Sequence, residues 1–255
     1  MKSLIVQGLA SAALFLTSTG LHAQTTLKPC VGKSVLTNQT LTFALYHSKL
    51  PGQLATTEHQ FRLSGSQFKI DSVSTAQGLL ALFYSGELRQ HSEGSIDGKL
   101  GLEPAYYSEQ RGKKPLRETL VNAADKQVIF KKNGETAQWQ RGTQDRLSMM
   151  YQLSSLLMCN NPKDDFFSVE LPVMTTGRLE TEVFRAEGTE RLEMKESGQE
   201  IVALKLSNTP KEGDDVIRLW FDPNNAYTPV QIQVQEADGQ SVTQTLIKRQ
   251  TEPTE

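Results

Sequence analysis

Three histidines, His47, His59 and His91, are the most versatile chemical groups after the N-terminal region. Three imidazoles brought together could hold a zinc ion, and one imidazole beside a serine could activate its hydroxyl. However, the sequence has no His-Glu-x-x-His, Gly-x-Ser-x-Gly, phosphate-loop or dinucleotide-binding pattern. We therefore predict no catalytic residues, no metal site and no cofactor. A hydrolase built from residues far apart in the sequence remains an open alternative.

The two cysteines, Cys30 and Cys159, could form a disulfide. Paired thiols persist in oxidising compartments, so the pairing depends on export. In the chain-entropy model, closing a loop of roughly 130 residues is worth about 4–5 kcal/mol. The alternative is two separate buried thiols.

The N-terminus has the layout of a secretory signal peptide. Lys2 is followed by the apolar stretch 4–16 and by the small-residue cleavage site Leu21-His22-Ala23. We expect cleavage after Ala23 and a soluble, exported mature protein. An uncleaved anchor is the alternative, but the stretch is shorter than the ~20 residues that span a bilayer.

A charged string precedes the one segment with helical periodicity. Leu147, Met150, Leu153 and Leu157 recur at helical spacing, which predicts a helix over about 143–159 with Thr143 as its N-cap. The sequence 160–162, Asn-Asn-Pro, is expected to end it. These four apolar residues are candidates to face a ligand, and ordinary core packing is the alternative.

Asp145 and Arg146 form a candidate polar anchor at the start of this helix. Charge-assisted hydrogen bonds from these two side chains could tie the helix to neighbouring strands. In the alternative reading, the two residues gate a cavity between the helix and the sheet.

The remaining chain alternates apolar and polar residues, which is typical of antiparallel strands with one buried face. The alternation covers 41–45, 61–63, 128–130, 167–173, 202–206, 217–221 and 230–234. Asp97-Gly98, Asn133-Gly134 and Asp238-Gly239 predict hairpins with type I′ turns. We expect ten to twelve strands in a mainly β fold. It would be a single large curved antiparallel sheet, a half-barrel or barrel-like, wrapped on one central α-helix. A split into two sheets is the alternative.

The composition excludes several classes of protein. The chain has 255 residues and a net charge of -2, without the basic excess of a nucleic-acid-binding protein. Hydrophobic residues make up 37%, too few for a protein with many membrane spans. No Pro/Gly/Ser-rich linker divides the chain, so we predict one β-rich domain over 24–255.

The segment 144–148, followed by 151–153, resembles the helix motif of domain of unknown function 3108, an uncharacterised family of bacterial envelope proteins. The segments 101–104, 109–112, 218–221, 228–230 and 243–246, with Gly239, are similar to it as well, in matching order and spacing. The resemblance covers roughly 40–249. It implies Gram-negative export and a fold similar in outline to the half-barrels of periplasmic lipoprotein carriers, and it supplies no catalytic residues.

Together these observations predict a non-enzymatic periplasmic protein that binds or carries an apolar or lipid-like ligand in the cell envelope. It would not be an integral membrane protein after cleavage and would not bind nucleic acid. The alternative is a structural or assembly factor of the envelope that acts through contacts with a protein partner.

Overall fold

The computed structural model describes residues 25–27, 36–78, 81, 86–99, 101–162, 167–194 and 198–252. The predicted signal peptide with its cleavage site at Ala23, and also Cys30, lie outside these residues. No helix in the described ranges is both long enough and apolar enough to cross a membrane.

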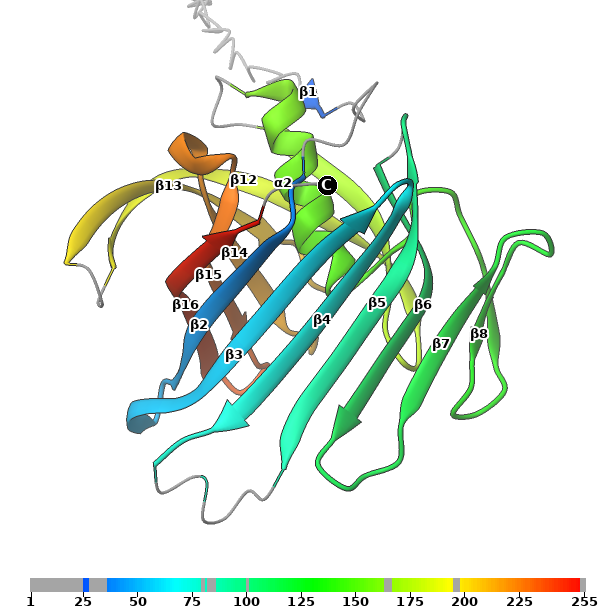
Figure 1. Cartoon of the computed structure of the whole chain (residues 1–255), viewed down its shortest axis with the longest axis horizontal. Helices are drawn as coiled ribbons and strands as arrows, with labels where there is room; N and C mark the ends of the chain where they lie inside the picture. The colour runs from blue at the N-terminus through cyan, green and yellow to red at the C-terminus, as the bar shows by residue number, and fades with distance from the viewer. Residues whose placement is uncertain are drawn as a thin grey trace, which may run out of the picture.

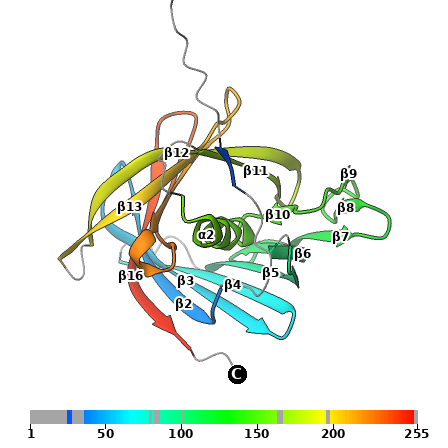
Figure 2. The same ribbon diagram turned by 90° about the horizontal axis from the view of Figure 1, so that it is seen from above.

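One large, curved sheet contains all the strands of the described residues and does not close on itself (Figures 1 and 2). Its strands are β1 (Thr25–Thr26), β2 (Gln39–His47), β3 (Leu50–Ser64), β4 (Gln67–Ala76), β5 (Glu87–Asp97), β6 (Gly101–Arg111), β7 (Arg117–Asn122), β8 (Gln127–Phe130), β9 (Thr136–Gln138), β10 (Gln144–Asp145), β11 (Phe167–Met174), β12 (Leu179–Met194), β13 (Gln199–Asn208), β14 (Val216–Asp222), β15 (Thr228–Gln235) and β16 (Ser241–Thr251).

Most neighbours in the sheet are consecutive in sequence. The order runs from β11 to β16 and then from β2 to β9, because β16 pairs antiparallel with β2. The prediction of a mainly β chain with one large sheet is confirmed. The expected count of ten to twelve strands was too low, since sixteen strands are described. β1, β9 and β10 have only two or three residues each, too few for an alternating pattern to reveal them.

The sheet is mixed, so the prediction of a wholly antiparallel sheet was wrong. β1 and β10 both run parallel to β11. For β10 the reason is the connection: the chain passes from β10 through the helix before it enters β11. Such a crossover returns the chain in the same direction, whereas a tight hairpin reverses it.

The predicted alternation matches the burial of the strands. Leu41 and Phe43 on β2 and Leu219 and Phe221 on β14 are fully buried. Val202 is the exception, at 45% exposed. It lies in the outer part of the β12–β13 hairpin (Figure 2), where its neighbours Ile201 and Ala203 face the core and Val202 points to the opposite, uncovered face.

The three predicted hairpins are present, but none of their turns is type I′ at the predicted residues, since Asp97, Asn133 and Asp238 all lack positive φ. Gly134 and Gly239 adopt positive φ values of 73° and 85°. A type I′ turn requires positive φ at both central residues. The connections 131–135 and 236–240 are longer than two residues, and one left-handed glycine is enough to reverse the chain in each.

The helix α2 (Ser148–Asn160) lies between β11–β13 on one side and β2–β6 on the other (Figure 2). It is the one α-helix among the described elements, and it contacts β6, β10 and β15. Every residue from Ser148 to Leu157 is buried. The ring of Tyr151 stacks on that of Phe61, with their centroids 4.7 Å apart. The helix therefore forms the centre of the hydrophobic core.

The helix begins later than predicted, and Thr143 is not its N-cap. The Thr143 hydroxyl instead donates to the carbonyl of Gln140 at 2.6 Å, in the turn before β10. The predicted end is confirmed: Asn161 adopts the left-handed conformation, and its N–H donates to the carbonyl of Leu157 at 2.8 Å.

Two glutamine side chains fasten α2 and β10 to β6. Gln152 Oε1 accepts from the N–H of Leu102 at 2.9 Å, and Gln144 Nε2 donates to the carbonyl of Leu102 at 2.7 Å. Gly101 is needed beside this contact, because a Cβ there would lie 2.3 Å from Gln152 Oε1. The N–H and the carbonyl of Leu102 thus both have hydrogen-bond partners, one on α2 and one on β10.

We expect Gln152→Leu to lower the free energy of unfolding by about 1–3 kcal/mol. The substitution leaves the buried N–H of Leu102 without an acceptor, and such a loss costs that much. Urea denaturation measures the change. Gln140→Leu, at an exposed position, is the matched control and should change stability by less than about 0.5 kcal/mol. Equal effects of the two substitutions would contradict the fastening role.

The predicted disulfide stays a prediction, because Cys30 lies outside the described residues. Cys159 lies near the end of α2, and the described residues include no free cysteine. We expect non-reduced exported protein to resist thiol alkylation and reduced, unfolded protein to gain two alkyl groups, one for each cysteine in the sequence. Mass spectrometry distinguishes the two forms. Alkylation of the non-reduced, unfolded chain would show two separate thiols.

Candidate ligand cavity between the helix and the sheet

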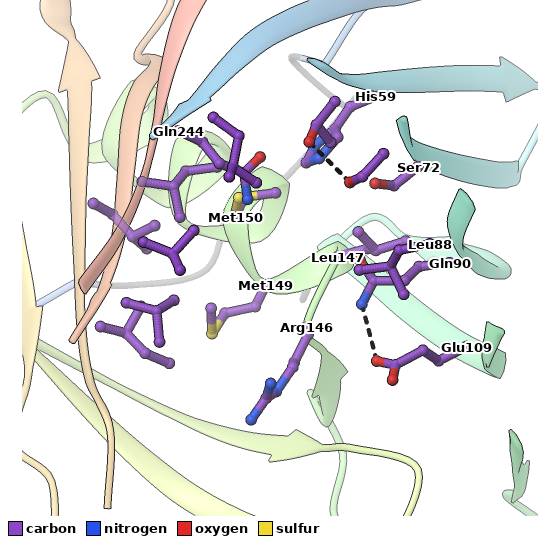
Figure 3. Close-up of a pocket in the computed structure, with 18 of the residues that line it drawn as sticks. His59, Ser72, Leu88, Gln90, Glu109, Arg146, Leu147, Met149, Met150 and Gln244 are labelled. Carbon is purple, nitrogen blue, oxygen red and sulfur yellow. Dashed lines mark hydrogen bonds between the residues drawn. The ribbon is translucent and has the colours of Figure 1, made fainter. Parts of the chain in front are cut away.

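A cavity of about 320 Å³ lies between the first turns of α2 and the inner face of the sheet (Figure 3). Its lining combines apolar and polar side chains. The apolar ones are Leu45, Leu88, Leu147, Met149, Met150, Ile217, Leu219, Ile232, Val234 and Val242. The polar ones are Thr57, His59, Ser72, Ser74, Gln90, Glu109, Arg111, Arg146, Asp215 and Gln244.

The two kinds of side chain come from different walls. β3, β4 and β5 supply hydroxyl, imidazole and amide groups, whereas β14 and β15 supply only branched aliphatic side chains. Met149 and Met150 add flexible thioethers from α2. Thioether side chains adapt to irregular apolar shapes. The cavity therefore has one polar wall and one apolar wall.

The cavity has a buried end, formed by neighbouring residues of β3 and β4. His59 and Ser72 are cross-strand partners and are only 3% and 1% exposed. The ring of Phe43 packs at 5.2 Å from that of His59, measured between centroids. Met150, 4% exposed, lines the cavity from the helix side.

The polar groups of His59 lack partners. Its Nδ1 is buried without a hydrogen bond, and no contact within the described residues joins its ring to the Ser72 hydroxyl. Burial lowers the pKa of His59 from 6.5 to about 4, because the charged imidazolium is poorly solvated there. At neutral pH the ring is therefore uncharged, with one nitrogen as donor and the other as acceptor.

Other polar groups of the same wall already have partners. The hydroxyls of Thr57 and Ser74 bond to each other at 2.8 Å. Gln90 Nε2 donates to the Tyr107 hydroxyl at 2.9 Å and to Glu109 Oε2 at 3.4 Å. These groups can contact a ligand, but they do not need one to complete their hydrogen bonds.

The opposite end of the cavity is open to solvent. Arg111 and Arg146 are exposed there, and Arg111 Nε pairs with Glu109 Oε1 at 2.9 Å. Arg146 also borders a small neighbouring pocket of about 60 Å³. A bound molecule would therefore have its exposed end among charged side chains.

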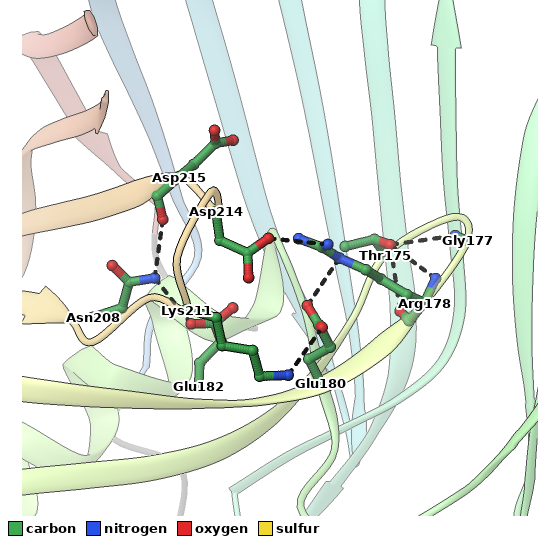
Figure 4. Close-up of polar contacts among 9 residues, drawn as sticks. All are labelled: Thr175, Gly177, Arg178, Glu180, Glu182, Asn208, Lys211, Asp214 and Asp215. Atoms are coloured by element: carbon green, nitrogen blue, oxygen red, sulfur yellow. Dashed lines mark hydrogen bonds and ion pairs between the residues drawn. The ribbon is translucent and has the colours of Figure 1, made fainter. Parts of the chain in front are cut away.

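Residues near that second pocket form a network of charged and polar contacts (Figure 4). Arg178 pairs with Glu180 at 2.9 Å and with Asp214 at 3.3 Å. Asn208 Nδ2 donates to Glu182 Oε2 at 2.9 Å and is 3.4 Å from the carbonyl of Asp215. These contacts hold the connection 209–215 against β12, beside the cavity opening.

The Asp145 carboxylate holds the start of α2 in place through hydrogen bonds. Its Oδ1 accepts from the N–H of Leu147 at 2.8 Å and of Ser148 at 3.0 Å, and its Oδ2 accepts from the hydroxyl of Ser92 on β5. Burial raises the pKa of Asp145, although these hydrogen bonds oppose the rise. The carboxylate thus performs the capping expected of Thr143, and it links the helix to the sheet.

The predicted site residues separate into two groups. Leu147 and Met150 line the cavity, whereas Leu153 and Leu157 are fully buried in the core and do not line it. The Arg146 side chain points toward the cavity opening (Figure 3). It therefore does not share the anchoring role of its neighbour Asp145.

Sequence reasoning missed Met149 and the polar wall. Met149 was not among the four candidate residues of the helix, and His59, Ser72 and Gln90 lie on three strands whose pairing the sequence does not give. Within the described ranges, no three His, Cys, Asp or Glu side chains gather closely enough to hold a metal ion.

Comparisons with known proteins agree with the resemblance. A family model described as "Protein of unknown function (DUF3108)" matches residues 45–247. No curated protein matches the sequence. The crystal structure of a beta-barrel-like protein of domain of unknown function DUF1849 from Brucella abortus is similar, with a TM-score of 0.53 and 11% identity. That match covers 87% of this chain and 100% of the other. At this identity the likeness shows the fold alone.

Two further solved structures match more weakly. One is a protein assigned as a lipoprotein from Parabacteroides distasonis, with 8% identity over 88% of this chain and 99% of the other. The second is a protein assigned as exported, with a YmcC-like fold, from Bacteroides fragilis, with 11% identity over 88% of this chain and 100% of the other. Both have a TM-score of 0.34, too low to carry an argument.

Proposed function

Since the chain belongs to the DUF3108 family, whose description assigns no activity, we propose from the cavity that it is a non-enzymatic periplasmic protein that binds an apolar or lipid-like ligand. The observation that carries the proposal is the cavity of about 320 Å³ between α2 and the sheet. Its volume is at the low end of ligand sites, which span ~300–1,000 Å³. It suits one chain or ring system rather than a whole lipid with several chains.

The apolar wall supports a ligand with a large apolar part. Ile217, Leu219, Ile232, Val234 and Val242 present hydrocarbon from three neighbouring strands, and Met149 faces the same space from α2. Burial of apolar surface gives about 25 cal/mol per Å², so a chain-sized molecule gains free energy by leaving water for this wall. The leader predicted before Gln24 supports export as the route to the periplasm.

The polar wall favours binding over catalysis. The one serine–histidine pair of the cavity, Ser72 and His59, lacks the hydrogen bond that proton transfer requires. With its pKa lowered to about 4, His59 is also a weak base at neutral pH. The open alternative of a hydrolase would need another base.

Native mass spectrometry tests the proposal. The chain with its leader is expressed in a Gram-negative host, released from the periplasm without detergent and sprayed under non-denaturing conditions. We expect the intact protein to carry one small apolar molecule, which organic solvent releases for identification. Protein that carries nothing, and that also takes up no fatty acid on incubation, would refute the proposal.

Partner binding at the sheet edges is the second candidate function. An exposed edge can accept a strand from another protein. The edge strands β9 and β1 have three and two residues, and such short strands commonly protect an edge from pairing. Crosslinking in intact cells would trap a stable partner if this function holds. The cavity argues more directly for a ligand.

A further inference from the structure

The buried end of the cavity holds polar groups without partners, and so does Gln244, whose Oε1 is buried and unpaired on the β16 part of the lining. His59 and Ser72 lie side by side on β3 and β4, almost fully buried, and neither makes a side-chain hydrogen bond within the described residues. By contrast, Thr57 and Ser74 satisfy each other one step nearer the opening. His59 Nδ1 is sealed off and stays unpaired whatever binds. The other ring nitrogen and the Ser72 hydroxyl, which also lack partners among the described residues, belong to side chains that line the cavity, where a ligand can satisfy them.

The chemistry of the pair indicates what would satisfy it. The Nδ1 atom of His59 is closed off from solvent, which leaves Nε2 as the ring nitrogen available to a ligand. That nitrogen donates or accepts according to the tautomer, and the Ser72 hydroxyl does both. A hydroxyl group on the ligand complements either arrangement, whereas a carbonyl only accepts.

Charge is unfavourable at this end. The charged residues of the lining, Glu109, Arg111, Arg146 and Asp215, are not on β3 or β4, and the two arginines are exposed at the opening. A charged ligand group beside His59 would be desolvated without an ion-pair partner. The buried end therefore suits a neutral polar group, while a charged headgroup would stay at the opening.

Resting on the ligand-binding function above, we propose that the ligand carries a neutral hydroxyl group on its apolar part, and that this hydroxyl binds His59 and Ser72 at the buried end of the cavity. The ligand class is thus a hydroxylated amphiphile rather than a plain hydrocarbon chain. It enters with the hydroxylated end first, against the Met150 side chain, and its apolar length lies along β14 and β15.

Two probes that differ only by this hydroxyl test the proposal on the full mature chain. Dodecanoic acid and ω-hydroxydodecanoic acid have the same chain length and the same carboxylate, and isothermal titration calorimetry gives both affinities. In a purely apolar cavity the terminal hydroxyl weakens binding, because it is desolvated without compensation. Here we expect the hydroxylated acid to bind roughly three- to tenfold more tightly, the effect of one or two net hydrogen bonds.

Three variants locate the effect. His59→Phe keeps an aromatic ring but removes both nitrogens, and we expect it to reverse the preference. Ser72→Ala should reduce the preference, and it provides a second test if His59→Phe folds poorly. Thr57 lines the same wall, but its hydroxyl already bonds to Ser74, so Thr57→Val is the control. This control should keep the wild-type preference.

The outcomes separate this inference from the function on which it rests. If wild-type protein binds dodecanoic acid more tightly than the hydroxylated acid, the hydroxyl proposal is wrong and ligand binding stands. If it binds neither acid, both are wrong. A preference that survives in both His59→Phe and Ser72→Ala would also overturn the proposal, because the hydroxyl would then bind elsewhere.

Discussion

Asp145→Ala is expected to lower the free energy of unfolding by about 3 kcal/mol or more, the largest effect of any single substitution considered for this chain. The carboxylate accepts from two backbone N–H groups at the start of α2 and from the Ser92 hydroxyl on β5. Its removal leaves three buried donors unpaired, at about 1–3 kcal/mol each. The loss is partly offset because a buried carboxylate no longer has to be desolvated.

Asp145→Asn is the matched control. The amide oxygen can still accept from Leu147 and Ser148, and the amide nitrogen can donate to the Ser92 oxygen. We expect stability within about 1 kcal/mol of wild type, measured by urea denaturation at neutral pH. If Asp145→Ala is as stable as Asp145→Asn, the carboxylate does not hold the helix to the sheet.

Because burial raises the pKa of Asp145, its ionisation also contributes to pH dependence. The contribution to stability is complete below the pKa of the unfolded chain and is lost as the pH rises through the raised pKa. Asp145→Asn removes this pH-dependent contribution to stability, because an amide does not ionise. Its stability should therefore fall less than that of wild type as the pH rises from acid to neutral.

The second large effect is acid destabilisation through His59. Its pKa falls from 6.5 in the unfolded chain to about 4 in the folded protein, so folding must keep the ring neutral. The stability from this group is present above pH 6.5 and is lost as the pH falls through 4. Between pH 7 and pH 4.5 the loss amounts to about 2 kcal/mol, from 1.36 kcal/mol per pKa unit.

The measurement compares wild type with His59→Phe at both pH values by urea denaturation. The difference between the two proteins isolates His59, since Asp145 and the surface carboxylates contribute to both. Wild type should lose about 2 kcal/mol more than His59→Phe on acidification. Parallel losses would mean that the ring is accessible to protons in the folded state.

Local patterns in the sequence were enough to predict most of the fold. Apolar residues at every second position marked β2, β11, β14 and β15, because one face of each of these strands packs on the core. The spacing of Leu147, Met150 and Leu153 marked α2. Asn161 marked its end, because asparagine tolerates the left-handed conformation.

Features that depend on distant contacts were not predictable. The helix starts at Ser148 because Asp145 reaches both its first N–H groups and Ser92, 53 positions earlier in the chain. The parallel pairing of β10 with β11 depends on how α2 crosses the sheet, and a two-residue strand carries no periodic signal. Val202 fits the alternation but is exposed, because Ile201 and Ala203 on the other face of β13 are the residues that meet the core there.

The candidate site was predicted only in part, for the same reason. Leu147 and Met150, two of the four candidate residues, line the cavity because both lie at the start of the helix, and their contact with a ligand stays a prediction. Leu153 and Leu157 share that helical face, but the core fills the space beside them. Pairing of His59 with Ser72 depends on the register of β3 and β4, which no local pattern fixes.

Binding of dodecanoic acid to two tryptophan variants tests the ligand cavity most directly. Ile217 and Val216 are adjacent, half-buried residues of β14, but only Ile217 lines the cavity. Successive side chains of a strand point to opposite faces, so Ile217→Trp fills the cavity and Val216→Trp leaves it open. Equilibrium dialysis should show binding by wild type and Val216→Trp, and binding weaker by roughly tenfold or more, at least 1.4 kcal/mol, in Ile217→Trp. Equal binding by all three proteins, or no binding by wild type, would contradict a ligand site between α2 and the sheet.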